Sequence, residues 1–135
     1  MQSSRQIHIR SSRFAIEPGE DEETNPGIYG RALSQWLAAQ LPAFGWNVKG
    51  CIAEDFGRLV EIDHPKFRLF VACTNGHDGK NSWQMFTFAE GGGILGIFAK
   101  PERQTLADQL LIDVDRAIRG DPATLDIQME NVHGA

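Results

Sequence analysis

The chain has 135 residues, of which 41% are hydrophobic and 23% charged, and its formal net charge at pH 7 is −5. This length is enough for one domain with its own core, without support from a metal or a disulfide. Binding to nucleic acid requires clustered Lys and Arg, and the acidic balance argues against it. We therefore expect a single domain over residues 1–135, with no cofactor and no nucleic-acid partner.

Neither a membrane location nor secretion is indicated. No stretch approaches the roughly 20 apolar residues of a membrane span, and the N-terminal segment lacks the apolar core of a secretory signal. We expect a cytoplasmic protein without membrane association. Cys51 and Cys73 fall in the second and fourth predicted strands. With one strand between them they would lie about 10 Å apart, too far for a disulfide, so we expect free thiols.

Residues 6–17 alternate like a strand with a phase error. Ile7 and Ile9 share one parity, whereas Phe14 and Ile16 share the other. A one-residue slip turns side chains to the opposite face of a sheet. A bulge at the serine pair between them would repair the phase, and a break into two short strands is the alternative.

The segment 17–24 is predicted to be a polar loop and the most disordered part of the chain, because it combines proline and glycine with a run of charge. Its acidic run is a candidate electrostatic contact with a partner. The run consists of Glu20, Asp21, Glu22 and Glu23.

The segment 25–45 is predicted to be one amphipathic helix. Asn25 is a suitable N-cap, Pro26 fits the first helical position, and Gly45 is a natural residue after the last turn. Its apolar residues recur at three- and four-residue spacing, which is typical of a helix with one buried face. They are Ile28, Tyr29, Ala32, Leu33, Trp36, Leu37 and Leu41. This face needs a partner surface, which the strands downstream would supply.

Four short strands are predicted after this helix, separated by turns that are too short for a parallel crossover. They cover residues 46–53, 58–63, 67–74 and 83–90. An antiparallel meander is the simplest topology for them. The three tryptophans, Trp36, Trp46 and Trp83, are expected to anchor the core.

The glycine-rich segment 91–101 follows the last of these strands and has two interpretations. Three consecutive glycines do not hold regular structure cheaply, yet the next residues are too apolar for a free loop. The segment either closes one end of the core or forms an apolar lip that contacts a partner. The apolar residues, which we take as candidate binding residues, are Ile94, Leu95, Ile97 and Phe98.

A second amphipathic helix is predicted over 101–119 and a last strand over 124–130, followed by a flexible tail at 131–135. The order is β-α-β-β-β-β-α-β. We expect an α+β fold with two layers, in which two helices cover one face of a mostly antiparallel sheet of about six strands. The residues expected on the other face are His8, Arg10, Lys49, Glu61, Arg68, Phe70 and Gln128.

No catalytic, cofactor or metal motif is present in the sequence. The weak catalytic candidates are His77 and Asp78, with Asp55. A histidine beside an aspartate could move a proton, but a tight polar hairpin has the same composition for turn reasons. We favour the turn and expect no metal site.

Two short motifs carry a resemblance. They are Asn25-Pro26-Gly27 with Tyr29-Gly30-Arg31, Leu33 and Trp36-Leu37, and Glu54-Asp55-Phe56-Gly57. Together they resemble a group of small uncharacterised bacterial proteins, which often have tryptophan in place of Phe56. The resemblance covers about residues 25–120 and implies the same fold and a bacterial or phage source. It implies no activity and no catalytic residue.

Three functions fit these observations. Small size, acidic charge and absent catalytic motifs favour a non-catalytic protein-binding module of immunity or inhibitor type, because acidic inhibitors present carboxylates to basic partners. The alternative is a small-molecule-binding domain or small enzyme, with a pocket between sheet and helices near Gly91–Gly93. A self-associating module using the open sheet face or the last strand is the third. Whether the chain is a monomer or a homodimer stays open.

Overall fold

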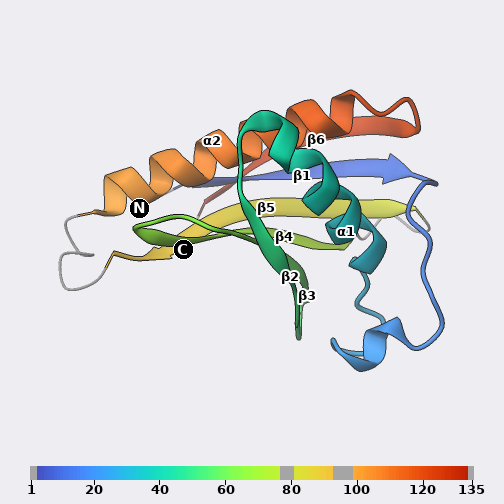
Figure 1. The fold of residues 1–135 in the computed structure, drawn as a ribbon. Helices are drawn as coiled ribbons and strands as arrows, with labels where there is room; N and C mark the ends of the chain where they lie inside the picture. Colours follow the sequence, from blue (N-terminus) through green and yellow to red (C-terminus); the bar gives the residue numbers. More distant parts are fainter. Residues whose placement is uncertain (1–2, 77–80, 93–98, 134–135) are drawn as a thin grey trace.

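Residues 3–76, 81–92 and 99–133 are described by the computed structural model, which has one six-stranded sheet and two α-helices (Figure 1). The strands and helices run β1 (Ser3–Ser11), α1 (Arg31–Gln40), β2 (Val48–Glu54), β3 (Gly57–Ile62), β4 (Phe67–Asn75), β5 (Ser82–Gly91), α2 (Lys100–Arg119) and β6 (Thr124–His133). Two 3-10 turns add η1 (Glu20–Glu22) and η2 (Leu41–Phe44). The α+β class and the element order expected from the sequence are confirmed.

The sheet has the strand order β2-β3-β4-β5-β1-β6, and every neighbouring pair is antiparallel. Strands β2 to β5 form the expected meander. The N-terminal strand β1 then lies between β5 and the C-terminal strand β6, so the two ends of the chain pair with each other. The sheet edges are β2 and β6, both of which border register shifts in their pairing.

Both helices lie on the same face of the sheet (Figure 1), and this face holds the main core. Alternate residues of the strands meet apolar residues of α1 and α2, as two-layer packing requires. Fully buried members of this core include Ile7, Val60, Val71, Met85, Leu33, Leu37, Leu110 and Val114. Trp83 is 2% exposed, while Trp36 and Trp46 pack against the core from its margin. The anchoring role is therefore confirmed for Trp83, whereas Trp36 and Trp46 are only partly buried.

The first helix begins five residues later than predicted, at Arg31 and not at Pro26. Asn25 and Pro26 are not its cap and first turn, since α1 starts at Arg31 after Gly30. Gly27 and Gly30 both have positive φ, +82° and +146°, a conformation that ends any helix reaching back to Asn25. The apolar stripe is confirmed for Ala32, Leu33, Trp36 and Leu37, which lie on α1. It is wrong for Ile28 and Tyr29, which precede the helix in a segment that is bonded to the sheet.

The change of parity between Ile9 and Phe14 coincides with the end of β1. β1 ends at Ser11. Residues 12–17 therefore form neither the second half of a bulged strand nor a separate short strand. A register shift does occur, but between His8 and Arg10, in the pairing with β6. Phe14 then enters the core from the loop, with its ring centroid 5.6 Å from that of Trp36, whereas Ile16 is 49% exposed.

The sheet face opposite the helices is more apolar than expected. Phe70 was predicted to face solvent or a partner, but it is 2% exposed. It packs in a second cluster with Leu59 and Ala72, and the partly buried Ile52, Phe86 and Phe88 complete this cluster. Phe70 and Phe88 stack with centroids 5.0 Å apart. No described helix covers this cluster.

The cysteine prediction is confirmed. Cys51 lies on β2 and Cys73 on β4, with β3 between them, and both are free. Burial raises the pKa of both thiols, and for Cys73 the neighbouring Cys51 raises it further. Since the thiolate is the nucleophilic form, neither residue is prepared for covalent catalysis.

Candidate protein-binding site

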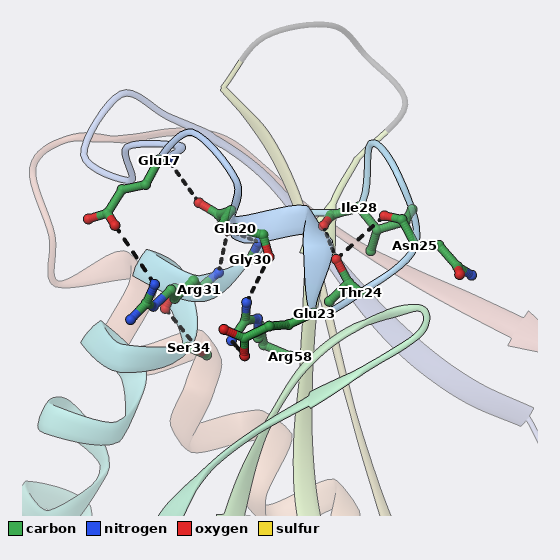
Figure 2. Close-up of polar contacts among 10 residues, drawn as sticks. All are labelled: Glu17, Glu20, Glu23, Thr24, Asn25, Ile28, Gly30, Arg31, Ser34 and Arg58. Atoms are coloured by element: carbon green, nitrogen blue, oxygen red, sulfur yellow. Dashed lines mark hydrogen bonds and ion pairs between the residues drawn. The ribbon is translucent and has the colours of Figure 1, made fainter.

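The loop between β1 and α1 is tied to the helix by a buried carboxylate. Glu20 is 4% exposed, and its Oε2 accepts from the backbone N–H of Gly30 and Arg31 at 3.4 and 3.3 Å, while Oε1 accepts from Glu17 N–H at 2.9 Å (Figure 2). The first N–H groups of a helix have no partner within it and carry its positive dipole end. Glu20 therefore caps α1 from a distance of ten residues along the chain.

Arg58 joins the same loop to the sheet. This residue of β3 is 7% exposed. Its Nη2 donates to the Glu20 carbonyl at 3.0 Å, and its Nη1 lies 3.4 Å from Oε2 of Glu23 (Figure 2). A buried guanidinium needs such acceptors, because an unpaired buried charge is costly. The acidic loop was predicted to be the most disordered part of the chain; instead, it contains the 3-10 turn η1 and is anchored at several points.

The two motifs of the resemblance meet in space. Asn25 N–H donates to the carbonyl of Asp55 at 2.9 Å. Asn75, at the end of β4, accepts from Tyr29 N–H at 3.0 Å and donates to the Gly27 carbonyl at 3.1 Å. Segments 30 residues apart in sequence are thus fastened at one end of the sheet. Asn25, Gly27, Tyr29 and Asp55 are therefore parts of a structural joint.

An exposed aromatic ring lies next to this joint, and the two segments of the joint carry carboxylates. Phe56, in the turn between β2 and β3, is 46% exposed, and its ring stacks on Phe86 with centroids 6.5 Å apart. Four exposed carboxylates lie in the two segments that meet here, and we call them the acidic rim. They are Glu22, Glu23, Glu54 and Asp55.

Beside Phe56, the sheet face opposite the helices is hollowed. A pocket of about 270 Å³ opens there, and we call it the sheet-face pocket. It is lined by Ile52, Glu54, Phe56, Leu59, Arg68, Phe70, Phe88 and Glu90. The floor is aromatic and aliphatic and the margin is charged. This combination is typical of the centre and rim of a protein interface.

The predicted site residues differ in their burial and in their contacts. Of the acidic run, Glu20 is buried as a cap, and Asp21 accepts from Gly27 N–H at 2.9 Å; Glu22 and Glu23 remain exposed. Asp55 is exposed in the turn before Phe56. The candidates His77 and Asp78, and the apolar residues Ile94, Leu95, Ile97 and Phe98, lie outside the described residues.

Phe56, Phe86 and Phe88 were missed as binding residues, although the sequence carried a signal for Phe86 and Phe88. In the strand WQMFTFAE, the two phenylalanines share one parity and Met85 has the other, so both faces are apolar. The same holds for Leu59 beside Val60 in β3. A strand with two apolar faces indicates burial on both sides.

Within residues 3–76, 81–92 and 99–133, no three His, Cys, Asp or Glu residues gather closely enough to hold a metal ion. None of the described helices is both long and apolar enough to span a membrane. No protein-family model, no curated protein and no solved structure matches the chain. The geometry of the sheet face and the acidic rim is therefore the basis for a functional proposal.

Proposed function

We propose that this chain is a non-catalytic protein-binding module of the immunity or inhibitor type, whose partner presents a basic surface. One observation carries the proposal. Phe56 is 46% exposed, follows Asp55 in the turn, and lines the sheet-face pocket together with Glu54, on a sheet face that no described helix covers. Aromatic side chains in such positions are the common energetic centres of interfaces.

Two physical effects support binding at this place. The acidic rim and the net charge of −5 would steer a basic partner and speed its association. Phe56 is held by its stacking on Phe86 and by the Asn25–Asp55 hydrogen bond at the neighbouring residue. A side chain already held in place loses less conformational freedom on binding, which favours affinity.

The test is affinity capture from the native host with a tagged chain and matched variants. Phe56→Ser is expected to release the captured protein, whereas Phe44→Ser, which removes a 37% exposed phenylalanine from η2, is expected to retain it. Removing an aromatic hot spot costs on the order of 2 kcal/mol or more, about 30-fold in affinity. Equal retention by both variants would exclude this face.

The apolar residues Ile94, Leu95, Ile97 and Phe98 remain a proposed second contact, with the exposed Glu22 and Glu23 as its electrostatic part. Glu20 and Asp21 are removed from this part, because Glu20 is buried and Asp21 bonds to Gly27. The same assay separates them from the Phe56 face. Loss of the partner in Leu95→Asp and Phe98→Asp, with retention in Phe56→Ser, would move the interface to that segment.

A small-molecule-binding domain or small enzyme is the second candidate, because a groove of about 270 Å³ lies between β5 and α2 beside Gly91. Lys100, Arg103 and Gln104 line it, which would suit an anionic ligand. Arg103 already donates to the Gly91 carbonyl at 3.1 Å. A thermal shift with small anions that disappears in Lys100→Ala, while Phe56→Ser has no effect on partner capture, would favour this function.

A further inference from the structure

The sheet-face pocket is large enough for one side chain and smaller than the usual pocket for a drug-sized ligand. Pockets that hold drug-sized ligands usually enclose about 300–1,000 Å³, and this one is about 270 Å³. Its floor is formed by Leu59 and Phe70, which are 5% and 2% exposed, with Phe88 stacked on Phe70. An occupant must therefore have an elongated or flat apolar part that can lie on these residues.

The charges around the pocket do not balance. Arg68 and Glu90 form an ion pair, with Nη1 and Oε1 3.5 Å apart. Glu54 also lines the pocket, but it has no ion pair or hydrogen bond among the described residues. A purely apolar occupant would remove water from Glu54 without giving it a partner, which is unfavourable. A cationic occupant would compensate this carboxylate.

Arg68 shows which cation the surface suits. Its guanidinium carbon lies 5.2 Å from the centroid of the Phe70 ring, while the same group pairs with Glu90. A planar guanidinium can stack on an aromatic face and bind a carboxylate at once, which an ammonium does less well. The pocket thus already holds one guanidinium between an aromatic ring and a carboxylate, and it has a second carboxylate available.

We propose that the sheet-face pocket receives an arginine side chain of the partner protein, with its aliphatic stem on Phe70, Phe88 and Phe56 and its guanidinium on Glu54. This inference rests on the proposed function and names the chemistry by which the partner is recognised. Arginine is among the residues most enriched at the energetic centres of interfaces. The exposed carboxylates of the acidic rim would then supply long-range attraction, and Glu54 the specific contact.

The test uses the free chain and needs no partner. The probe is Nα-acetyl-arginine methylamide, followed by NMR on the backbone and the aromatic rings, and its neutral isostere Nα-acetyl-citrulline methylamide is the control. We expect saturable shifts at Phe56, Phe70 and Phe88, with a dissociation constant of roughly millimolar for a fragment of this size. The citrulline probe is expected to bind about tenfold more weakly, because it lacks the charge.

Two variants with the same change in net charge test the contact. Glu54→Gln is expected to weaken the arginine probe about tenfold, whereas Glu22→Gln, in the acidic rim but outside the pocket lining, is expected to change it less than twofold. Their spectra also report whether each variant is folded. Absent shifts, equal binding of both probes, or equal effects of both variants would overturn the proposal.

The two proposals fail separately. If Phe56→Ser releases the captured protein while the arginine probe does not bind, the interface stands and the assigned occupant is wrong. If the probe binds in the pocket while Phe56→Ser still retains the partner, the pocket chemistry is right, but the sheet face is not where the partner binds, and the proposal of a partner arginine is overturned.

Discussion

Glu20 has a structural role that its neighbours in the acidic run do not share. Its carboxylate accepts three backbone N–H groups, and such capping oxygens contribute about 0.5–2 kcal/mol each to stability. Glu20→Ala would leave the buried Gly30 N–H and the partly buried Arg31 and Glu17 N–H groups without this acceptor. We expect a loss of about 2–3 kcal/mol in the free energy of unfolding, measured by chemical denaturation. The exposed Glu22→Ala is the matched control, with an expected change within about 0.5 kcal/mol, and equal effects would contradict the capping role.

Asp121 should make stability sensitive to acid. Its side chain is 2% exposed, and Oδ1 accepts from Arg13 Nη2 at 2.7 Å, while Arg13 Nε also bonds to Oδ2. The hydrogen bond from Arg13 lowers the pKa of Asp121 below its usual 3.8. A carboxyl whose pKa is lower in the folded state contributes stability above its unfolded pKa and loses it as pH falls through the folded pKa.

The measurement is the free energy of unfolding of wild type and Asp121→Asn as a function of pH. We expect the variant to be less stable at neutral pH, and the difference to shrink as the pH falls below about 4. Asp63→Asn, at an exposed position, controls for the loss of one charge and is expected to change stability little. A difference between wild type and Asp121→Asn that stays constant down to pH 2 would contradict the ion pair.

At the scale of elements, the start of α1 depends on the close approach of Gly30 to β4. Its φ is +146°, and a Cβ built there would lie 2.6 Å from the Cys73 carbonyl oxygen. Gly30→Ala would add this clash to the backbone strain, so we expect a loss of roughly 3 kcal/mol or more. Gly27 also has positive φ, +82°, but a Cβ there would meet nothing within 4 Å. Gly27→Ala is therefore expected to cost only about 1 kcal/mol.

Thermal or chemical denaturation of the two alanine variants measures this difference. Similar losses in both would mean that backbone conformation, and not contact with β4, decides the position of α1. A second outcome also tests the joint: if Gly30→Ala is tolerated, the loop and the sheet are not fastened as tightly as the Asn75 and Arg58 contacts indicate.

The elements themselves were predictable because periodicity is a local signal. Alternation located β2 to β6 to within a few residues, and the 3.6-residue spacing located α2. What failed depended on distant contacts. Asn25 and Pro26 are good helix starters, but the hydrogen bond from Asn25 to Asp55 holds them in a turn. Likewise, Glu20 is the buried member of the acidic run 20–23. The sequence does not distinguish it from its neighbours, because its burial depends on its position beside α1.

At the scale of the whole molecule, the two-layer arrangement followed from the pattern, whereas the candidate site did not. Helices on one face were implied by two amphipathic stripes and a mostly antiparallel sheet. The second apolar face was overlooked because Phe70 was assigned to solvent, and its packing with Phe88 comes from the register of β4 on β5. The acidic rim was half predicted, since its loop was named but its meeting with Glu54 and Asp55 was not.

The edges of the sheet argue against self-association through strand pairing. Edge strands that carry bulges and charges resist pairing with another copy. In β2, the register shifts between Val48 and Gly50, with Lys49 at the shift; in β6, Asp126 has a positive φ of +52°. An acidic chain also repels its own copies. We therefore expect sedimentation analysis at high protein concentration to give the mass of one chain. A dimer that Phe56→Ser dissociates would mean that the sheet-face pocket binds a second copy, and a dimer that this variant leaves intact would mean that the strand edges pair despite their irregularities.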